Sequence, residues 1–446
     1  MKKLAVVTSI ILSVSILLGG ALSHAADMDY DLYFRTPVGT NGSGGKHIPL
    51  SNPGSRGNEF RLGNEGAYGE ASFTAHALRG KTTSDPFFKA NLTFAYDPAM
   101  NSQYNDTTAS GDRTYLVQAF VKGGNIDDQR FSYWAGKRFY RDADIFMNDF
   151  FYFANMSGNG GGVEDIQLSN GTLSVAWLQH SDRTLLTSTI GYPTKQALDL
   201  RWKDFTFATG EKLMFWLAQA NTAPGTGTTS TGTAVDFQAE SGTAAGVRWT
   251  HSAGDSTNNL ALLYGTSIME NFELDNTAYA VTGANVSSKN RMRLVNNYNT
   301  EVNAKWAFNA AAVIETADNG QSSNSKSRWY SVGIRPMYYF SDHFHLVTGI
   351  GYSIVNADSE VSTTTGKKTG DRSLMRISIA PQVAIGKGFY KRPVIRTFVA
   401  YTSWNEANKD LGNTEGLVAK LNGGGNRAMN NKDGALQFGV EGEIWF

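Results

Sequence analysis

Few side chains in this sequence are spaced for catalysis or for metal binding. The chain has no G-x-S-x-G motif, no H-E-x-x-H motif and no cysteine, so the common nucleophile and zinc signatures are missing. His343 and His345, on one face of an expected strand, are the only close histidine pair, and two ligands without a third make a weak metal site. The glycine run 160–162 lacks the strand-to-helix context of a phosphate-binding loop. We therefore expect a protein that is not an enzyme and holds no metal or cofactor.

The segment 138–162 mixes charged residues with aromatic rings, side chains that could bind a solute. Seven aromatic residues occur between Phe139 and Phe153. The charged residues among them are Arg138, Arg141, Asp142, Asp144 and Asp149. An ordinary surface loop would leave these rings unburied. We therefore expect the segment to fold inward, into the space that the other elements enclose, and to narrow it.

The elements that must position these groups are strands, because apolar and polar residues alternate with period two. In the last thirteen residues one face is apolar and the other polar. The apolar face carries Leu436, Phe438, Val440, Gly442, Ile444 and Phe446, and the polar face carries Gln437, Gly439, Glu441, Glu443 and Trp445. Three further segments alternate in the same way, at 30–35, 198–203 and 328–340, the last with Pro336 on its apolar face. One side of each strand is suited to lipid and the other to water.

This alternation favours a transmembrane barrel over a soluble β-sandwich. Aromatic residues cluster near the ends of the apolar faces, as Tyr330, Tyr338 and Phe340 do, and such positions suit the two membrane interfaces. Open strand edges cannot face hydrocarbon, so a strand-built membrane protein must close on itself. The terminal Phe446 is similar to the assembly signal of bacterial outer-membrane proteins. We predict an all-β, antiparallel transmembrane barrel.

The first residues predict a secretory leader. Lys2 and Lys3 precede an apolar stretch from Leu4 to Leu18, and small residues follow up to Ala26. A stretch of about 15 residues is shorter than the roughly 20 that a membrane-spanning helix needs, which argues against an anchor. We expect cleavage after Ala25, so that residues 1–25 are the signal peptide and residues 26–446 are the barrel.

Composition limits the remaining possibilities. Beyond the leader no uncharged apolar run reaches the roughly 18 residues of a transmembrane helix. The chain carries 40 basic and 40 acidic residues, so no nucleic acid partner is expected. With no cysteine the exported protein has no disulfide, and no linker divides it into domains. Polar segments at Asn221–Thr233, Ser359–Asp371 and Asn405–Lys432 are predicted to be extracellular loops.

Several segments, in order along the chain, resemble the maltoporin (sugar-specific porin) family. They are RLGNE at Arg61–Glu65, WAGKRFY at Trp134–Tyr140, MSGNGGGVEDI at Met156–Ile166, WYSVGIRPMYYF at Trp329–Phe340, RPVIRTFVAYTSW at Arg392–Trp404 and EIWF at the end. The resemblance covers residues 29–446. It implies a barrel of about 18 strands that forms a homotrimer in the bacterial outer membrane. It also implies guided passive diffusion of maltose and maltodextrin-type oligosaccharides.

The resemblance carries site residues with it. In this family a line of aromatic rings in the lumen, the slide, binds the apolar faces of pyranose rings, and polar residues opposite bind the hydroxyls. The slide positions correspond to Tyr33, Tyr68, Tyr104, Tyr390 and Trp445, where Tyr104 is the ring expected to reach a neighbouring subunit. The polar track and constriction correspond to Arg35, Arg61, Glu70, Asp144, Asp149 and Phe151.

Five positions depart from the family pattern. Thr257 stands near the sixth slide position, where the family has Phe. Asp142 and Val117 stand at or near positions of Arg, Phe151 at that of a constriction Tyr, and Ala154 at that of Asp. These exchanges leave three alternatives open for the transported solute. The channel is a maltodextrin porin, a related porin for sucrose or β-glucosides, or a general diffusion porin without sugar preference.

Overall fold

The structure of this protein is a computed structural model. It describes residues 27–42, 44, 47–97, 113–128, 130–181, 194–228, 234–274, 286–323, 325–358, 370–408 and 433–446. The predicted signal peptide lies outside these residues, and so does Tyr104. No helix in the described ranges is long and apolar enough to span a membrane.

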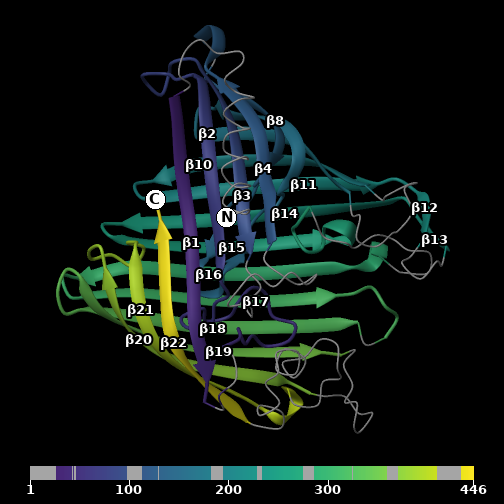
Figure 1. The fold of residues 1–446 in the computed structure, drawn as a ribbon. Coiled ribbons are helices and arrows are strands. Elements are labelled where there is room, and N and C mark those ends of the chain that lie inside the picture. The colour runs from purple at the N-terminus through teal and green to yellow at the C-terminus, as the bar shows by residue number, and fades with distance from the viewer. Residues whose placement is uncertain are drawn as a thin grey trace, which may run out of the picture.

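Eighteen strands form one antiparallel sheet, and pairing of β1 with β22 closes it into a barrel (Figure 1). The strands are β1 (Asp27–Asn41), β2 (Tyr68–Leu78), β3 (Phe87–Asp97), β4 (Arg113–Gly124), β5 (Ser132–Arg138), β8 (Gly158–Gln167), β9 (Thr172–Ser181), β10 (Thr194–Ala208), β11 (Glu211–Thr222), β14 (Glu240–Ala253), β15 (Ser256–Thr266), β16 (Asn290–Asn303), β17 (Trp306–Asp318), β18 (Lys326–Tyr339), β19 (Phe344–Ala357), β20 (Arg372–Ala384), β21 (Val394–Trp404) and β22 (Gly434–Trp445). The predicted fold class is confirmed. Closure leaves no strand edge unpaired.

Short elements occupy the connections between these strands. They are the strands β6 (Asp144–Ile145), β7 (Phe150–Phe151), β12 (Gly225–Thr228) and β13 (Ala234–Phe237), and the 3-10 turns η1 (Ile126–Asp128), η2 (Phe146–Asn148), η3 (Ser267–Met269), η4 (Val286–Ser288) and η5 (Glu406–Asn408). Two of them bear on a predicted loop, Asn221–Thr233. Its first two residues, Asn221 and Thr222, end β11. Residues 225–228 form β12, which pairs with β13.

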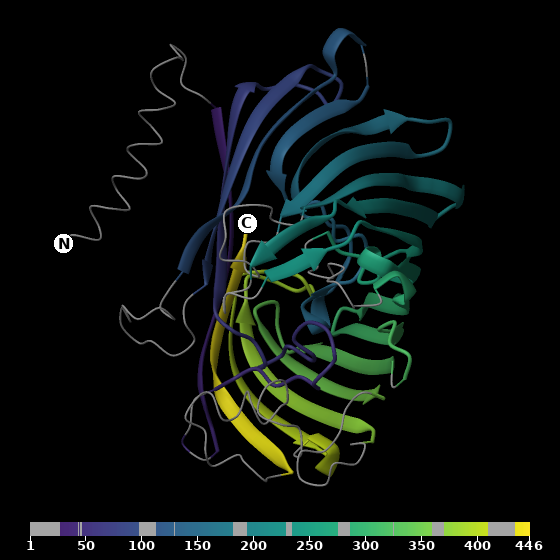
Figure 2. The same ribbon diagram turned by 90° about the vertical axis from the view of Figure 1, so that its right-hand side faces the viewer.

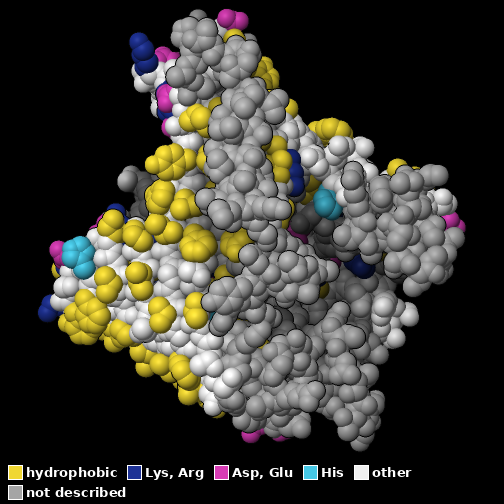
Figure 3. Space-filling view, viewed as in Figure 1, with side chains coloured by type: hydrophobic (Ala, Val, Ile, Leu, Met, Phe, Trp, Pro, Cys, Tyr) yellow, Lys and Arg dark blue, Asp and Glu magenta, His cyan; other side chains and the backbone are white. Residues whose placement is uncertain are grey.

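The two faces of the wall are those that the alternation predicts. On β22 the outward side chains Leu436, Phe438 and Val440 are 43 to 48% exposed, whereas Glu441 and Glu443 are buried. On β18 the outward Tyr330 and Val332 are exposed in the same way. Apolar side chains spread over the outside of the barrel wall in Figure 3. This outer surface suits hydrocarbon, and the buried polar face lines the lumen.

The connections differ between the two ends of the barrel. At the end where β1 begins and β22 ends the turns are short, such as the two residues between β10 and β11 and the two between β14 and β15. At the other end they are longer, as in residues 42–67 between β1 and β2. Outer-membrane barrels have short periplasmic turns and long extracellular loops. The predicted loops Ser359–Asp371 and Asn405–Lys432 begin and end at this second end, and most of their residues lie outside the described ranges.

Two long connections fold into the barrel. Residues 139–157, between β5 and β8, form the inward loop that the sequence predicts. The loop is shorter than the predicted segment 138–162, because Arg138 belongs to β5 and residues 158–162 belong to β8. We call it the constriction loop. Five of its seven rings are buried, and the centroid of the Phe150 ring lies 5.9 Å from that of Trp329 on the barrel wall. The carbonyl oxygens of Tyr140 and Ala154 in this loop accept hydrogen bonds from Arg201 of β10.

The first long connection, residues 42–67, also enters the barrel, which the sequence analysis did not predict; Figure 2 shows it in purple inside the ring of strands. Its residues Leu50, Glu59 and Glu65 are fully buried. The Glu59 carboxylate accepts a hydrogen bond from the Trp329 indole at 3.0 Å. Gly351 permits this packing, because a Cβ there would overlap the Phe60 ring. Two inward loops therefore narrow the lumen instead of one.

Candidate functional site: a narrowed lumen with an aromatic wall

The lumen at the constriction is a cavity of about 790 Å³. It is lined by ten of the eleven site residues implied by the family resemblance: Tyr33, Arg35, Arg61, Tyr68, Glu70, Asp144, Asp149, Phe151, Tyr390 and Trp445. The eleventh, Tyr104, lies outside the described residues. The fold thus brings together side chains that come from both ends of the sequence and from both inward loops.

Strand register places the first three rings of the wall. Tyr33 of β1 is the direct partner of Trp445 on β22, and on its other side it pairs with Glu70 of β2. Tyr68 pairs with Arg35, two residues further along β1. Residues opposite one another in an antiparallel pair point to the same face, so all of these side chains enter the lumen.

Together with Phe146 and Tyr390, these three rings form a continuous line, which we call the aromatic path. Its order is Tyr68, Tyr33, Trp445, Phe146 and Tyr390. Ring centroids are separated by 6.2 Å from Tyr68 to Tyr33 and by 6.2 Å from Tyr33 to Trp445. The next steps, from Trp445 to Phe146 and from Phe146 to Tyr390, measure 6.0 Å and 5.5 Å. Such separations and tilts are those of attractive aromatic pairs. The path gives the lumen an apolar stripe along its wall.

Phe146 was missed by the sequence analysis as a site residue. It belongs to η2 in the constriction loop and reaches the wall between Trp445 and Tyr390. The Arg61 guanidinium lies 4.1 Å from its ring centroid. The sequence shows Phe146 as one of seven aromatic residues in the segment, and nothing in the local pattern distinguishes the one ring that joins the path.

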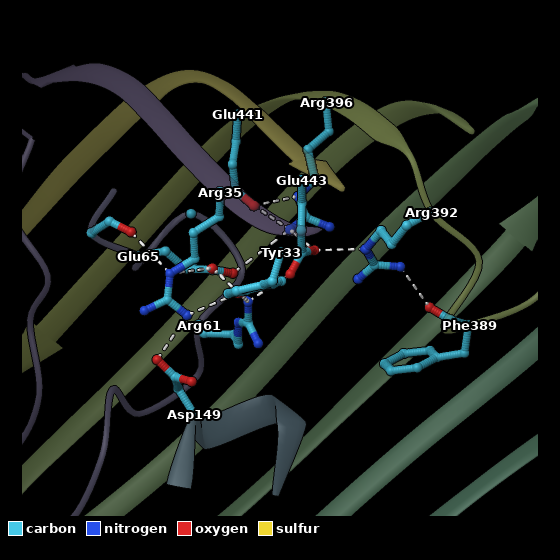
Figure 4. A network of polar contacts seen from close by, with 12 residues as sticks. Tyr33, Arg35, Arg61, Glu65, Asp149, Phe389, Arg392, Arg396, Glu441 and Glu443 are labelled. Atoms are coloured by element: carbon cyan, nitrogen blue, oxygen red, sulfur yellow. Dashed lines mark hydrogen bonds and ion pairs between the residues drawn. The ribbon is translucent and has the colours of Figure 1, made fainter. Parts of the chain in front are cut away.

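Beneath the aromatic path lies a buried network of ion pairs (Figure 4). Glu443 accepts hydrogen bonds from Arg61 and Arg392, each at 2.7 Å. Arg61 also pairs with Glu65 at 2.7 Å, and Arg396 pairs with Glu441. Charges this deeply buried require paired partners and hydrogen bonds. The network therefore fixes the first inward loop, which supplies Arg61 and Glu65, to strands β21 and β22.

The same network reaches the constriction loop and the path. Arg35 pairs with Asp149 of the loop at 2.8 Å. The Tyr33 hydroxyl accepts hydrogen bonds from Arg61 at 3.1 Å and from Arg35 at 3.3 Å. Tyr33 is thus held in place by two guanidinium groups while its ring faces the cavity. Rigid walls of this kind keep the width of the constriction constant.

A second ion pair ties the other side of the constriction loop to the opposite wall. Asp142 pairs with Arg248 of β14, and the Lys203 ammonium lies 3.7 Å from the same carboxylate. Burial acts to raise the pKa of Asp142, but these two cations outweigh it and hold the pKa below its ordinary value. Asp142 stands where the family has Arg, so here the loop carries a negative charge toward a basic wall.

Three groups remain directed at the cavity. Asp144 lines it, and the surrounding protein keeps bulk water from this carboxyl and raises its pKa above the ordinary value. Glu70 accepts a hydrogen bond from the Tyr68 hydroxyl at 2.6 Å. The Arg141 guanidinium lies 3.7 Å from the Phe151 ring centroid. Donors and acceptors of hydrogen bonds therefore line the same cavity as the apolar rings.

The far wall contributes residues that the sequence analysis also missed, namely Arg248, Asn259 and Asn297. Each lies on the inward face of its strand, so strand parity is a signal that could have found them. Of the departures from the family pattern, Val117, Ala154 and Thr257 do not line the described cavity. Thr257 shares the inward face of β15 with Asn259, two residues away.

Each imidazole of the pair His343 and His345 lies next to a polar group of the protein. His343 lies in the turn before β19 and not on a strand face, because β19 begins at Phe344. Its Nδ1 lies 3.1 Å from the carbonyl oxygen of Ala384. The Nδ1 of His345 lies 3.2 Å from the Gln382 amide nitrogen. Among the residues that the structure describes, no group of three or more His, Cys, Asp or Glu side chains is arranged to hold a metal ion.

Three solved structures are distant relatives in fold. OccK2 (OpdF) of Pseudomonas aeruginosa, in complex with glucuronate, is 9% identical, with 94% of this chain and 98% of that chain covered and a TM-score of 0.48. A BenF-like porin of Pseudomonas fluorescens Pf-5 is 11% identical, with coverages of 94% and 99% and a TM-score of 0.46. The trimer form of OmpT from Vibrio cholerae is 10% identical, with coverages of 95% and 100% and a TM-score of 0.39.

A family model described as LamB porin matches residues 28–446, which is almost the whole chain. This match agrees with the closed 18-stranded barrel and with its narrowed lumen. The chain therefore belongs to the LamB porin family, the maltoporins, and is a channel of the bacterial outer membrane.

Proposed function

We propose that this porin is sugar-specific and that maltose and maltodextrin-type oligosaccharides cross the outer membrane through it by guided passive diffusion. The observation that carries the proposal is the aromatic path, five rings in sequence along the lumen wall, with charged groups lining the same cavity. A channel without sugar preference needs no such line of rings. Membership of the LamB porin family supports the same solute class.

The chemistry of a sugar ring matches the two sides of this lumen. A pyranose presents C–H groups on its faces and hydroxyls around its rim. Its faces would lie against the rings of the aromatic path, and its hydroxyls would meet Asp144, Glu70 and the arginines that line the same cavity. Because neighbouring rings are similar and each contact is weak, a sugar can move from one to the next without being trapped.

We also propose that the protein functions as a homotrimer surrounded by outer-membrane lipid. Family membership supports this assembly, which has closed cyclic symmetry. Tyr104 would then extend the slide from a neighbouring subunit. The outward apolar faces of strands such as β18 and β22 supply the lipid-facing surface.

Current recordings in a planar bilayer test the sugar preference. A sugar-specific channel shows an ion current that falls saturably as sugar is added, with maltotriose and longer α-linked glucose oligomers blocking at the lowest concentration. Block by sucrose or by β-glucosides at lower concentration would assign the protein to another sugar. No saturable block by any sugar in the panel would show a general diffusion porin and would refute the proposal.

A further inference from the structure

One cation in the constriction has a setting unlike the others. The Arg141 guanidinium lies between two aromatic rings of its own loop, with its Cζ 3.7 Å from the Phe151 centroid and 4.1 Å from the Phe139 centroid. A planar guanidinium stacks well on aromatic faces, whereas an ammonium group does not. Arg141 and Phe151 both line the cavity. The two side chains therefore act as one stacked unit at the constriction.

The hydrogen-bonding capacity of this unit is not used within the described part of the chain. Arg35 pairs with Asp149, Arg61 with Glu65 and Glu443, and Arg248 with Asp142. No carboxylate in the ranges that the structure describes lies within ion-pair distance of Arg141, which also makes no hydrogen bond there. Stacking occupies the faces of the guanidinium and leaves its N–H groups, which lie in the plane, free to point into the cavity.

From this geometry we propose that Arg141 is the specificity-determining donor of the constriction and that it binds two adjacent equatorial hydroxyls of a passing sugar. The proposal rests on the sugar-porin function proposed above. Phe151 stands where the family has a tyrosine and lacks its hydroxyl. Arg141, stacked on the Phe151 ring, supplies hydrogen-bond donors at the same place and presents two of them side by side.

The preferred solute follows from the planar shape of the guanidinium. A sugar ring that lies flat against the aromatic path directs its equatorial hydroxyls sideways across the lumen, and an axial hydroxyl points out of the ring plane. The paired N–H groups of a guanidinium match two oxygens that lie side by side in one plane. Glucose-configured sugars, with equatorial hydroxyls at C2 and C3, should therefore bind better than mannose-configured sugars, whose C2 hydroxyl is axial.

The test compares Arg141→Gln and Arg141→Lys with the unmodified porin in planar bilayers, using maltotriose as the blocking sugar. We expect the half-blocking concentration to rise roughly tenfold in Arg141→Gln, because a hydrogen bond to a charged donor is lost. Arg141→Lys keeps the charge but cannot stack, so a similar rise is expected. Lys212→Gln removes an exposed cation at the start of β11, far along the chain from the constriction loop, and maltotriose should block this variant as it blocks the unmodified porin.

A second measurement uses the unmodified porin with two trisaccharides that differ only at C2, cellotriose and β-1,4-mannotriose. We expect cellotriose to block at a severalfold lower concentration, and Arg141→Gln to remove most of that difference. Equal block by the two sugars in the unmodified porin overturns the role of Arg141. So does a half-blocking concentration of maltotriose in Arg141→Gln that is within twofold of the value for the unmodified porin. Absence of block by every sugar in the unmodified porin instead refutes the sugar-porin function itself.

Discussion

Replacing Trp445 with alanine should weaken sugar block while the barrel still assembles. Trp445 is one residue from the end of the chain, and its ring lies in the middle of the aromatic path, 6.2 Å from Tyr33 and 6.0 Å from Phe146. The Arg392 guanidinium lies 4.3 Å from its centroid. Its neighbour Phe446 points the other way and is 59% exposed on the outer surface. The two final side chains therefore serve opposite faces of one strand.

The expected size of the effect comes from the contact that is lost. One aromatic contact with a sugar face contributes about 1 kcal/mol beyond burial. Losing it raises the half-blocking concentration roughly fivefold. The backbone pairings of β22 with β1 and β21 do not involve the Trp445 side chain, so the barrel should assemble and its ion conductance should change little.

The assay is titration of maltotriose against the single-channel current in a bilayer, with two comparison variants. Phe446→Ala should reduce the amount of assembled barrel in the outer membrane and leave the half-blocking concentration unchanged. Trp177→Ala removes a tryptophan that is 51% exposed on the outside of β9 and should leave sugar block unaltered. Normal block by Trp445→Ala, or lost sugar affinity in Phe446→Ala, would refute the face assignment and with it the aromatic path.

Three further outcomes are expected. Phe151→Tyr adds a hydroxyl at the constriction, so single-channel conductance should fall. Block by linear glucose oligomers should strengthen by a few fold, which corresponds to about 1 kcal/mol for one hydrogen bond. Unchanged conductance and block would place residue 151 away from the solute. Asp142→Asn removes the charge that pairs with Arg248, so the constriction loop should be held less firmly and single-channel conductance should rise at low salt and less so at high salt. The detergent-purified protein should be a heat-resistant trimer by light scattering, and a stable monomer that is still blocked by sugar would contradict this.

Much of the barrel wall could be predicted from the sequence because a strand beside lipid has little freedom. The period-two pattern in residues 434–446 requires Glu441 and Glu443 to face inward once Leu436 and Phe438 face outward, since a slip of one residue would exchange every side chain. The same argument put Trp445 in the lumen. Family resemblance then assigned Tyr33 and Arg35, which the register of β1 against β22 brings beside it.

The contents of the lumen were decided by the tertiary structure. The packing of Phe60 against β18 and β19, the position of Phe146 between Trp445 and Tyr390, and the pairing of Asp142 with Arg248 all join segments far apart in the chain. An inward loop has no repeating pattern that fixes which of its rings meets the wall. Its path is set by contacts and ion pairs that exist only after the barrel has closed around it, whereas the faces of a strand are fixed locally by the alternation of its own residues.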